Sequence, residues 1–167
     1  MVTPTTMDDL HVREAVSTDE PFLRQMLAIA ADWRNAEASP LSDPLPEPLA
    51  SYVRGFGGPT DFGTVASTED RDIGAAWCRL FPPEDPGYGY VGPDVPEVAI
   101  AVIAGLRGVG IGAHLMAAVL AQARRREFPA VSLSVAPDNP AAALYRRFGF
   151  ENARVEHDAQ TMVRRLR

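Results

Sequence analysis

The sequence contains no lysine, and all 16 of its basic side chains are arginines. A phosphate-binding loop of the Walker A type needs a lysine, so the composition excludes that class of nucleotide site. The only cysteine, Cys78, cannot form an internal disulfide, and a lone cysteine in an apolar segment is most often a core residue. The three histidines lie far apart and near no cysteine, so we expect no bound metal.

Long hydrophobic runs are also missing. No apolar stretch reaches the length of a membrane-spanning helix, and the first nine residues are polar and acidic, unlike a signal peptide. Together with the single cysteine, these features predict a cytoplasmic protein that contacts no membrane. With 167 residues, 46% of them hydrophobic, the chain is long enough for one globular domain, which we expect to span residues 1–167.

The net charge of −6 is divided unevenly along the chain. Residues 1–97 hold 17 acidic side chains and 6 arginines, a net charge of −11, whereas residues 98–167 hold 5 acidic side chains and 10 arginines, a net charge of +5. Chance clustering of surface charge is one explanation. The other is that the basic half binds a small polyanion and the acidic half a cation. We do not expect nucleic acid as a partner, because the protein as a whole would repel it.

Hydrophobic periodicity predicts a series of strands and helices along the chain. In the first half, Asp19 is the expected N-cap of a helix that runs to about Trp33, and the proline-rich stretch 40–48 should have no regular structure. The remaining elements expected here are strands over 11–15, 63–67 and 73–81, a short helical segment over 48–56, and a long surface loop over 82–96.

The second half begins with an almost unbroken apolar run, EVAIAVI (97–103), typical of a central strand buried on both faces. A helix over 111–127 and a strand over 131–135 follow, which predicts a crossover between two parallel strands. Asn139 is the expected N-cap of a short helix that ends near Phe148. The last two expected strands cover 150–156 and 161–166.

A glycine-rich turn, Arg107 to Ala113 (RGVGIGA), joins the central strand to the long helix. Its three glycines allow a tight turn and expose main-chain N–H groups at a helix N-terminus. Such a site favours a phosphate or pyrophosphate, because the helix dipole adds positive charge there. The glycine spacing fits neither a Walker A loop nor a dinucleotide fingerprint, and an ordinary loop remains the alternative.

The pattern Arg107-x-x-Gly110-x-Gly112, placed after an apolar strand and before an amphipathic helix, resembles the central motif of the GNAT superfamily of N-acetyltransferases. The downstream segment 139–150 (NPAAALYRRFGF) resembles the motif that follows it in that family. The resemblance implies an α/β (α+β) fold: a mixed, mostly antiparallel central sheet of about six to seven strands with helices on both faces. It also divides the domain into an acceptor-side half (8–96), an acetyl-CoA-binding core (97–150) and C-terminal strands (151–167).

The resemblance implies roles for individual residues. Asn139 would contact the pantetheine arm of acetyl-CoA near its thiol end, and Tyr145 would donate a proton to the departing thiolate. Helix capping and helix packing are the structural alternatives for these two residues. Main-chain groups of the central strand would pair with the arm and the turn would hold the pyrophosphate; the residues are Ile100, Ala101, Val102, Arg107, Gly108, Val109, Gly110, Ile111, Gly112 and Ala113.

The implied reaction needs a base, because only a neutral amine can attack the thioester. Glu97, at the start of the central strand, matches an acidic position found in many members of the family. A solvated strand-end residue is the alternative for Glu97, and a water chain is the alternative base. The loop 82–96 adds acidic and aromatic groups that suit a cationic amine, unless it is a solvated insertion; these are Glu84, Asp85, Tyr88, Tyr90 and Asp94.

These features predict an acetyl-CoA-dependent N-acetyltransferase that moves an acetyl group to a primary amine by direct attack. The expected acceptor is a cationic small-molecule amine or peptide amine. The alternative function is a catalytically silent acyl-CoA-binding sensor or partner subunit. Dimers are common in such families, and the sequence does not distinguish a homodimer from a monomer.

Overall fold

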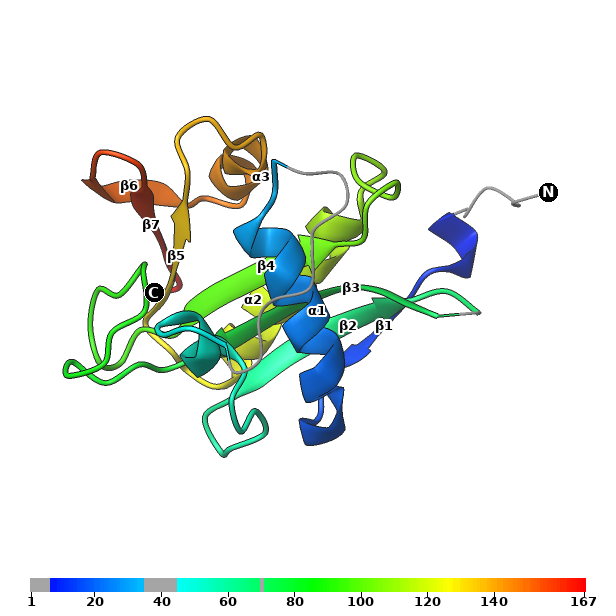
Figure 1. Cartoon of the computed structure of the whole chain (residues 1–167), viewed down its shortest axis with the longest axis horizontal. Helices are drawn as coiled ribbons and strands as arrows, with labels where there is room; N and C mark the ends of the chain where they lie inside the picture. Colours follow the sequence, from blue (N-terminus) through cyan, green and yellow to red (C-terminus); the bar gives the residue numbers. More distant parts are fainter. Residues whose placement is uncertain (1–6, 35–44, 70) are drawn as a thin grey trace.

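The computed structural model describes residues 7–34, 45–69 and 71–167. In these ranges seven strands form one sheet in the order β1-β2-β3-β4-β5-β7-β6, and β4 and β5 are the parallel pair in an otherwise antiparallel sheet (Figure 1). The strands are β1 (His11–Glu14), β2 (Phe62–Ser67), β3 (Asp72–Arg79), β4 (Glu97–Val102), β5 (Ala130–Val135), β6 (Glu151–Val155) and β7 (Gln160–Arg165). The helices are α1 (Glu20–Ala31), α2 (Ile111–Arg125) and α3 (Ala141–Arg147), with 3-10 turns η1 (Met7–Asp9), η2 (Ser17–Asp19) and η3 (Leu49–Tyr52).

Helices cover both faces of the sheet. One hydrophobic cluster packs α2 and α3 against it, and a second packs α1 and η3 against the opposite face (Figure 1). Successive side chains of a strand point to opposite faces, so Val98 and Val102 of β4 join the first cluster while Ala101 joins the second. This explains the unbroken apolar run in the sequence. The predicted fold class is confirmed.

The predicted helices and strands are found with boundaries within two residues of those expected, apart from the segment 48–56. That segment contains only the short turn η3, and most of the proline-rich stretch 40–48 lies outside the described residues. The loop 82–96 has no helix or strand, as expected, although Gly89 and Pro96 within it are buried. None of the helices in the described ranges is long and apolar enough to cross a membrane.

Asp19 occupies the predicted N-cap position of α1, but its side chain caps no N–H group of that helix. The turn η2 precedes the helix, and the Asp19 carboxylate accepts the N–H of Val16 at 2.8 Å instead of an N–H of α1. It also forms an ion pair with Arg13 of β1, with a shortest distance of 2.7 Å. Hydrogen bonds from Arg13 lower the pKa of this carboxyl group. Asp19 therefore ties β1 to the start of α1.

The strands β4 and β5 lie side by side only at their N-terminal ends. Glu97 and Ser132 are the registered pair that joins them in the described structure, and the Ser132 N–H donates to the carbonyl of Pro96 at 3.0 Å. Beyond this pair β5 turns away from β4 toward α3 (Figure 1). The loop 82–96 packs against β5 next to the point where the two strands separate. Its Gly89 lies so close to β5 that a Cβ there would be 2.6 Å from the carbonyl carbon of Leu133.

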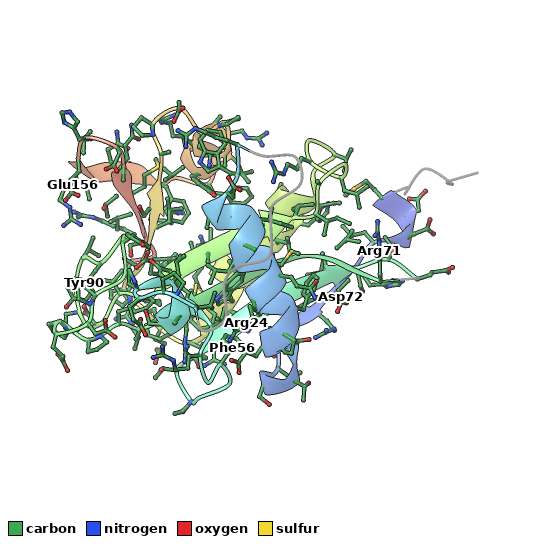
Figure 2. All side chains as sticks on the ribbon, viewed as in Figure 1. Arg24, Phe56, Arg71, Asp72, Tyr90 and Glu156 are labelled. Atoms are coloured by element: carbon green, nitrogen blue, oxygen red, sulfur yellow. The ribbon has the colours of Figure 1, made fainter. Side chains whose placement is uncertain are left out.

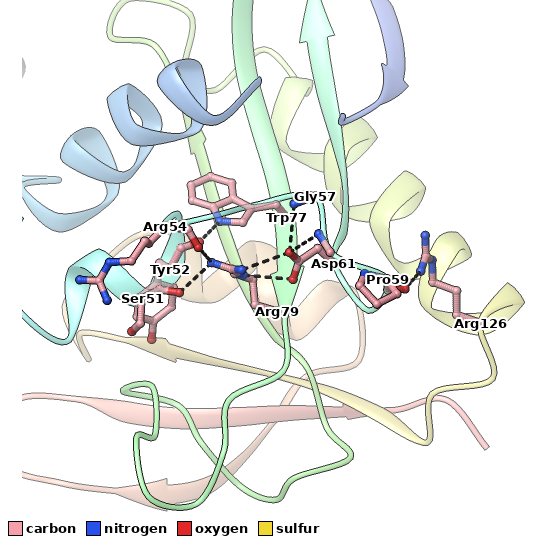
Figure 3. A network of polar contacts seen from close by, with 10 residues as sticks. Ser51, Tyr52, Arg54, Gly57, Pro59, Asp61, Trp77, Arg79 and Arg126 are labelled. Atoms are coloured by element: carbon pink, nitrogen blue, oxygen red, sulfur yellow. Dashed lines mark hydrogen bonds and ion pairs between the residues drawn. The ribbon is translucent and has the colours of Figure 1, made fainter. Parts of the chain in front are cut away.

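Arg79, at the end of β3, joins η3 to the sheet through a polar network (Figure 3). Its Nε and Nη2 donate to the two carboxylate oxygens of Asp61 at 3.0 and 3.1 Å. Its Nη1 donates to the carbonyls of Ser51 and Arg54 at 3.1 and 2.6 Å. Asp61 also accepts the N–H of Gly57 at 3.0 Å. The network fixes the position of η3, which carries residues of the site described below.

We expect Arg79→Met to lower the free energy of unfolding by about 3 kcal/mol, because the buried Asp61 carboxylate would lose its cation. Urea denaturation measures this change. The control is Arg54→Met, which breaks an exposed ion pair with Glu47 and should cost less than about 1 kcal/mol. Equal losses in the two variants would contradict a structural role for the Arg79 network.

Candidate active site

A cleft of about 1360 Å³ opens where β4 and β5 separate. Its walls come from β4, the glycine turn, the end of β5 and α3, and on the other side from the end of α1, η3 and the loop 82–96. The predicted site residues that line the cleft are Glu97, Ile100, Ala101, Val102, Arg107, Gly108, Gly110, Gly112, Ala113, Asn139 and Tyr145. Two predicted residues do not line it: Val109 is about half exposed and Ile111 is buried in the core.

The main-chain N–H and C=O groups of successive β4 residues point alternately toward β3 and toward the cleft. Ile103 donates its N–H to the carbonyl of Ile73, near the start of β3, at 2.9 Å, whereas the carbonyl of Pro96 accepts from Ser132 on β5. Odd-numbered residues of β4 therefore bond to β3, and even-numbered residues face β5.

Because of this alternation, the N–H and C=O groups of Ile100 and Val102 point toward the opening between the strands. Those of Ala101 point toward β3 and are used there. An extended, amide-rich ligand can therefore pair with Ile100 and Val102, as an added strand would, but not with the main chain of Ala101. Sequence reasoning named all three residues because it could not determine which edge each one faces.

The glycine turn presents main-chain donors to the cleft. Gly108 and Gly110 have φ angles of +80° and +92°, a region that favours glycine. No N–H group of residues 107–113 donates a hydrogen bond within the described part of the chain. These donors stand at the N-terminus of α2, where the helix dipole adds positive charge, so the turn can hold a phosphate or pyrophosphate.

Two arginines connect the end of α1 to the opposite rim of the cleft. Arg107 donates to the carbonyl of Trp33 at 3.3 Å, just beyond the end of α1. Arg34 forms an ion pair with Asp138 at 2.9 Å, and its guanidinium lies 4.3 Å from the centre of the Trp33 ring. These exposed contacts bring the end of α1 beside the turn and the start of α3.

Asn139 has a capping role and also lines the cleft. Its Oδ1 accepts the N–H of Ala141, the first residue of α3, at 2.9 Å. The predicted capping contact is therefore present, although the helix begins one residue later than expected. The side-chain amide of Asn139 makes no other hydrogen bond in the described structure, so its N–H groups can serve a ligand.

Tyr145 lies on α3 with 8% of its surface exposed, and its ring packs edge-on against Phe150. Its hydroxyl makes no hydrogen bond to any described residue, and the side chain contributes to the cleft wall. Burial raises the pKa of Tyr145 to about 12. The phenol is therefore protonated at neutral pH and can donate to an anion in the cleft.

Glu97 is buried, with only 3% of its surface exposed, so it is not a solvated strand-end residue. The Tyr52 hydroxyl donates to its Oε1, and the N–H of Gly89 donates to the same oxygen at 2.9 Å. Burial raises the pKa of Glu97 to about 7, although both hydrogen bonds lower it. A carboxylate with this pKa can take a proton from a ligand near neutral pH.

The loop 82–96 contributes an aromatic side chain to the cleft. Tyr88 lines it, whereas the acidic residues Glu84, Asp85 and Asp94 are exposed and lie outside its wall. Tyr90, labelled in Figure 2, packs against the cluster beneath α1. The structure therefore does not bring the predicted acidic set together at the cleft.

Cys78 is fully buried in β3, and burial raises the pKa of its thiol, so it is unsuited to carry an acyl group. No three metal-ligating side chains come together in the described ranges. Sequence reasoning missed Tyr52 and Gly89, because nothing in their local sequence indicates a contact with Glu97.

Comparisons with known proteins identify the family of the chain. The sequence profile of the acetyltransferase (GNAT) family matches residues 26–150, and the chain belongs to this family. Acetyl-CoA, the cosubstrate expected from the sequence, is the acetyl donor of the family.

Two curated relatives are mycothiol acetyltransferases. The one from Saccharomonospora viridis is 37% identical over 101 residues, 59% of this chain and 32% of the relative. The one from Geodermatophilus obscurus is 33% identical over 129 residues, 76% of this chain and 35% of the relative. The chain therefore spans about a third of the length of these relatives.

A solved structure shares the fold. The phosphinothricin acetyltransferase from Sinorhizobium meliloti, solved in complex with AcCoA, has a TM-score of 0.68 and 21% sequence identity. The similarity covers 95% of this chain and 89% of that one.

We expect Gly110→Asp to raise the Kd for acetyl-CoA by about tenfold or more, because it places a carboxylate beside the donors of the turn. Isothermal titration calorimetry measures this Kd. The matched control is Gly105→Asp: Gly105 also has a positive φ (+87°) but does not line the cleft. A normal Kd in Gly110→Asp would show that the turn does not hold the pyrophosphate.

Proposed function

We propose that the chain catalyses the transfer of an acetyl group from acetyl-CoA to a primary amine by direct attack. The observation that carries this proposal is that one cleft contains both a buried carboxylate with a pKa near 7 and a buried, protonated phenol. The first can accept a proton from an ammonium group, and the second can donate one to a thiolate. Membership in the acetyltransferase family supports the same reaction class.

The cleft offers groups suited to acetyl-CoA along its length. The unpaired groups of Ile100 and Val102 suit the amides of the pantetheine arm, and the donors of residues 107–113 suit the pyrophosphate. Asn139 has free amide N–H groups near the opening. When bound, acetyl-CoA supplies a thioester whose carbonyl is open to an amine.

The protein's own groups then move two protons. Glu97 accepts one from the ammonium form of the acceptor, which leaves a neutral amine able to attack. The N–H of Val102 faces the opening and can stabilise negative charge on the carbonyl oxygen. As the carbon–sulfur bond breaks, Tyr145 donates its proton to the thiolate. The second proton that the nitrogen loses on becoming an amide restores the phenol of Tyr145. The products are an N-acetylated amine and coenzyme A.

The acceptor side of the cleft favours a cationic amine with an apolar or aromatic body. The described residues there are mainly apolar and aromatic, among them Trp33, Leu49 and Tyr88. Among the described residues of the lining, the two carboxylates are Asp138 and Glu97. Asp138 is paired with Arg34, so Glu97 remains for the ammonium group. The names of the two curated relatives, for mycothiol, support a small-molecule acceptor.

A thiol-release assay across a panel of amines tests the proposal. We expect saturable, amine-dependent release of coenzyme A with at least one cationic amine and formation of its N-acetyl product by mass spectrometry. Tight acetyl-CoA binding without turnover of any amine would instead support the alternative of a silent acyl-CoA-binding sensor or partner subunit.

We expect Tyr145→Phe to lower kcat by about 100-fold, because the thiolate would leave without its proton donor. The Kd for acetyl-CoA should change little, since the ring still packs against Phe150. Steady-state kinetics and calorimetry measure the two quantities separately. An unchanged kcat would remove Tyr145 from the mechanism.

A further inference from the structure

We propose that Tyr52 is a positioning residue for the general base: its hydroxyl fixes Oε1 of Glu97, so that Oε2 is the oxygen left free to hold the proton that the acceptor amine loses. The inference rests on the proposed function, because it assigns an amine to the cleft beside Glu97.

The two oxygens of Glu97 have different surroundings. Oε1 accepts hydrogen bonds from the Tyr52 hydroxyl and from the N–H of Gly89. Oε2 is buried and has no hydrogen-bond partner in the described structure. A carboxylate that is held through one oxygen in this way keeps the other available for a proton.

The proton of the Tyr52 hydroxyl has a fixed direction. The hydroxyl oxygen accepts the N–H of Tyr88 at 2.9 Å, and this contact occupies one of its lone pairs. Its single hydrogen is thereby directed to Glu97. Tyr52 therefore serves as a donor to the carboxylate, with the loop 82–96 completing the arrangement through Tyr88 and Gly89.

Gly87 leaves the space in which this arrangement fits. A Cβ at this position would lie 2.2 Å from Oε2 of Glu97 and 2.9 Å from the Tyr52 hydroxyl oxygen. Any other residue would displace the carboxylate or the phenol. Two glycines of the loop thus contact the Glu97 carboxylate: Gly89 donates its N–H to Oε1, and Gly87 leaves room for Oε2.

Tyr52 is itself held firmly. The indole N–H of Trp77 donates to its main-chain carbonyl at 2.8 Å (Figure 3). Its ring centre lies 4.9 Å from that of Phe81 and 6.2 Å from that of Tyr88, which is nearly parallel to it. The Arg79 network fixes Ser51 of η3 and Arg54 just beyond it. The phenol can therefore orient Glu97 without reorganisation.

No cation neutralises Glu97 among the described residues. Arg79 is its cross-strand partner on β3, but the guanidinium is bonded to Asp61 and to main-chain carbonyls. The other groups around the carboxylate are uncharged near neutral pH: Cys78 on β3, Ser132 on β5, and the phenol of Tyr52. The charge of Glu97 is therefore stabilised chiefly by Tyr52 and Gly89, against the cost of burial.

The test compares Tyr52→Phe with Tyr90→Phe, which removes a hydroxyl that makes no hydrogen bond in the described structure and lies outside the cleft lining. Two readouts are followed: the pH dependence of kcat/KM, and titration of the Glu97 carboxyl by ¹³C NMR, assigned with Glu97→Gln. In the wild type both should show a pKa of about 7. In Tyr52→Phe both should rise by about one unit, with kcat about tenfold lower at neutral pH and an unchanged Kd for acetyl-CoA.

A second variant perturbs the same geometry without touching the phenol. Gly87→Ala should lower kcat at least as much as Tyr52→Phe, because its Cβ displaces the carboxylate, while thermal unfolding and acetyl-CoA binding stay close to wild type. Tyr90→Phe should match the wild type in every readout.

The outcomes separate this inference from the proposed function. A lower kcat in Tyr52→Phe with an unshifted titration and pH profile would overturn the inference, because Tyr52 would then give only structural support. A shifted NMR titration with an unshifted pH profile would overturn it too, because Glu97 would not be the base. If no amine were turned over by the wild type, the proposed function would fail, while the NMR titration would still report on the Tyr52–Glu97 contact.

Discussion

The separation of β4 from β5 is the constraint on which the rest of the structure depends. Main-chain groups in the middle of a sheet are normally hydrogen-bonded, and leaving them unpaired is costly. Here the two strands pair only at Glu97 and Ser132, and the edge of β4 beyond them faces a cleft. Gly89 lies against the main chain of β5 beside this opening. The same opening exposes the strand edge, brings the glycine turn within reach and places Glu97 at its base.

The loop 82–96 contacts both β5 and Glu97 and also forms part of the cleft wall. It packs against β5 through Gly89, donates a hydrogen bond to Glu97 and supplies Tyr88 to the cleft wall. Burying Glu97 opposes its ionisation, and the Tyr52 and Gly89 donors offset part of that cost, which leaves a pKa near 7. The sequence suggested a cationic acceptor because the loop carries acidic residues. Those residues lie outside the cleft lining, and the proposal of a cationic acceptor now depends on Glu97 of β4.

Most of the fold could be predicted because its signals are local. The apolar run of β4, the amphipathic pattern of α2 and the glycines at 108 and 110 depend on neighbouring residues, and each is found where expected. Two expectations differ from the structure. The segment 48–56 forms only a short 3-10 turn, and Asp19 bonds to Arg13 and Val16 because η2 precedes the helix.

The sequence alone determined the order of elements, the family resemblance and the position of the glycine turn, since periodicity and backbone freedom are properties of short segments. Only the tertiary structure decided which main-chain groups of β4 face the cleft, since this depends on pairing with β3 and β5. It also decided that Glu97 is buried beneath Tyr52, a residue 45 positions away in the chain. A carboxylate's proton affinity depends on the groups that fold around it, and no local pattern contains them.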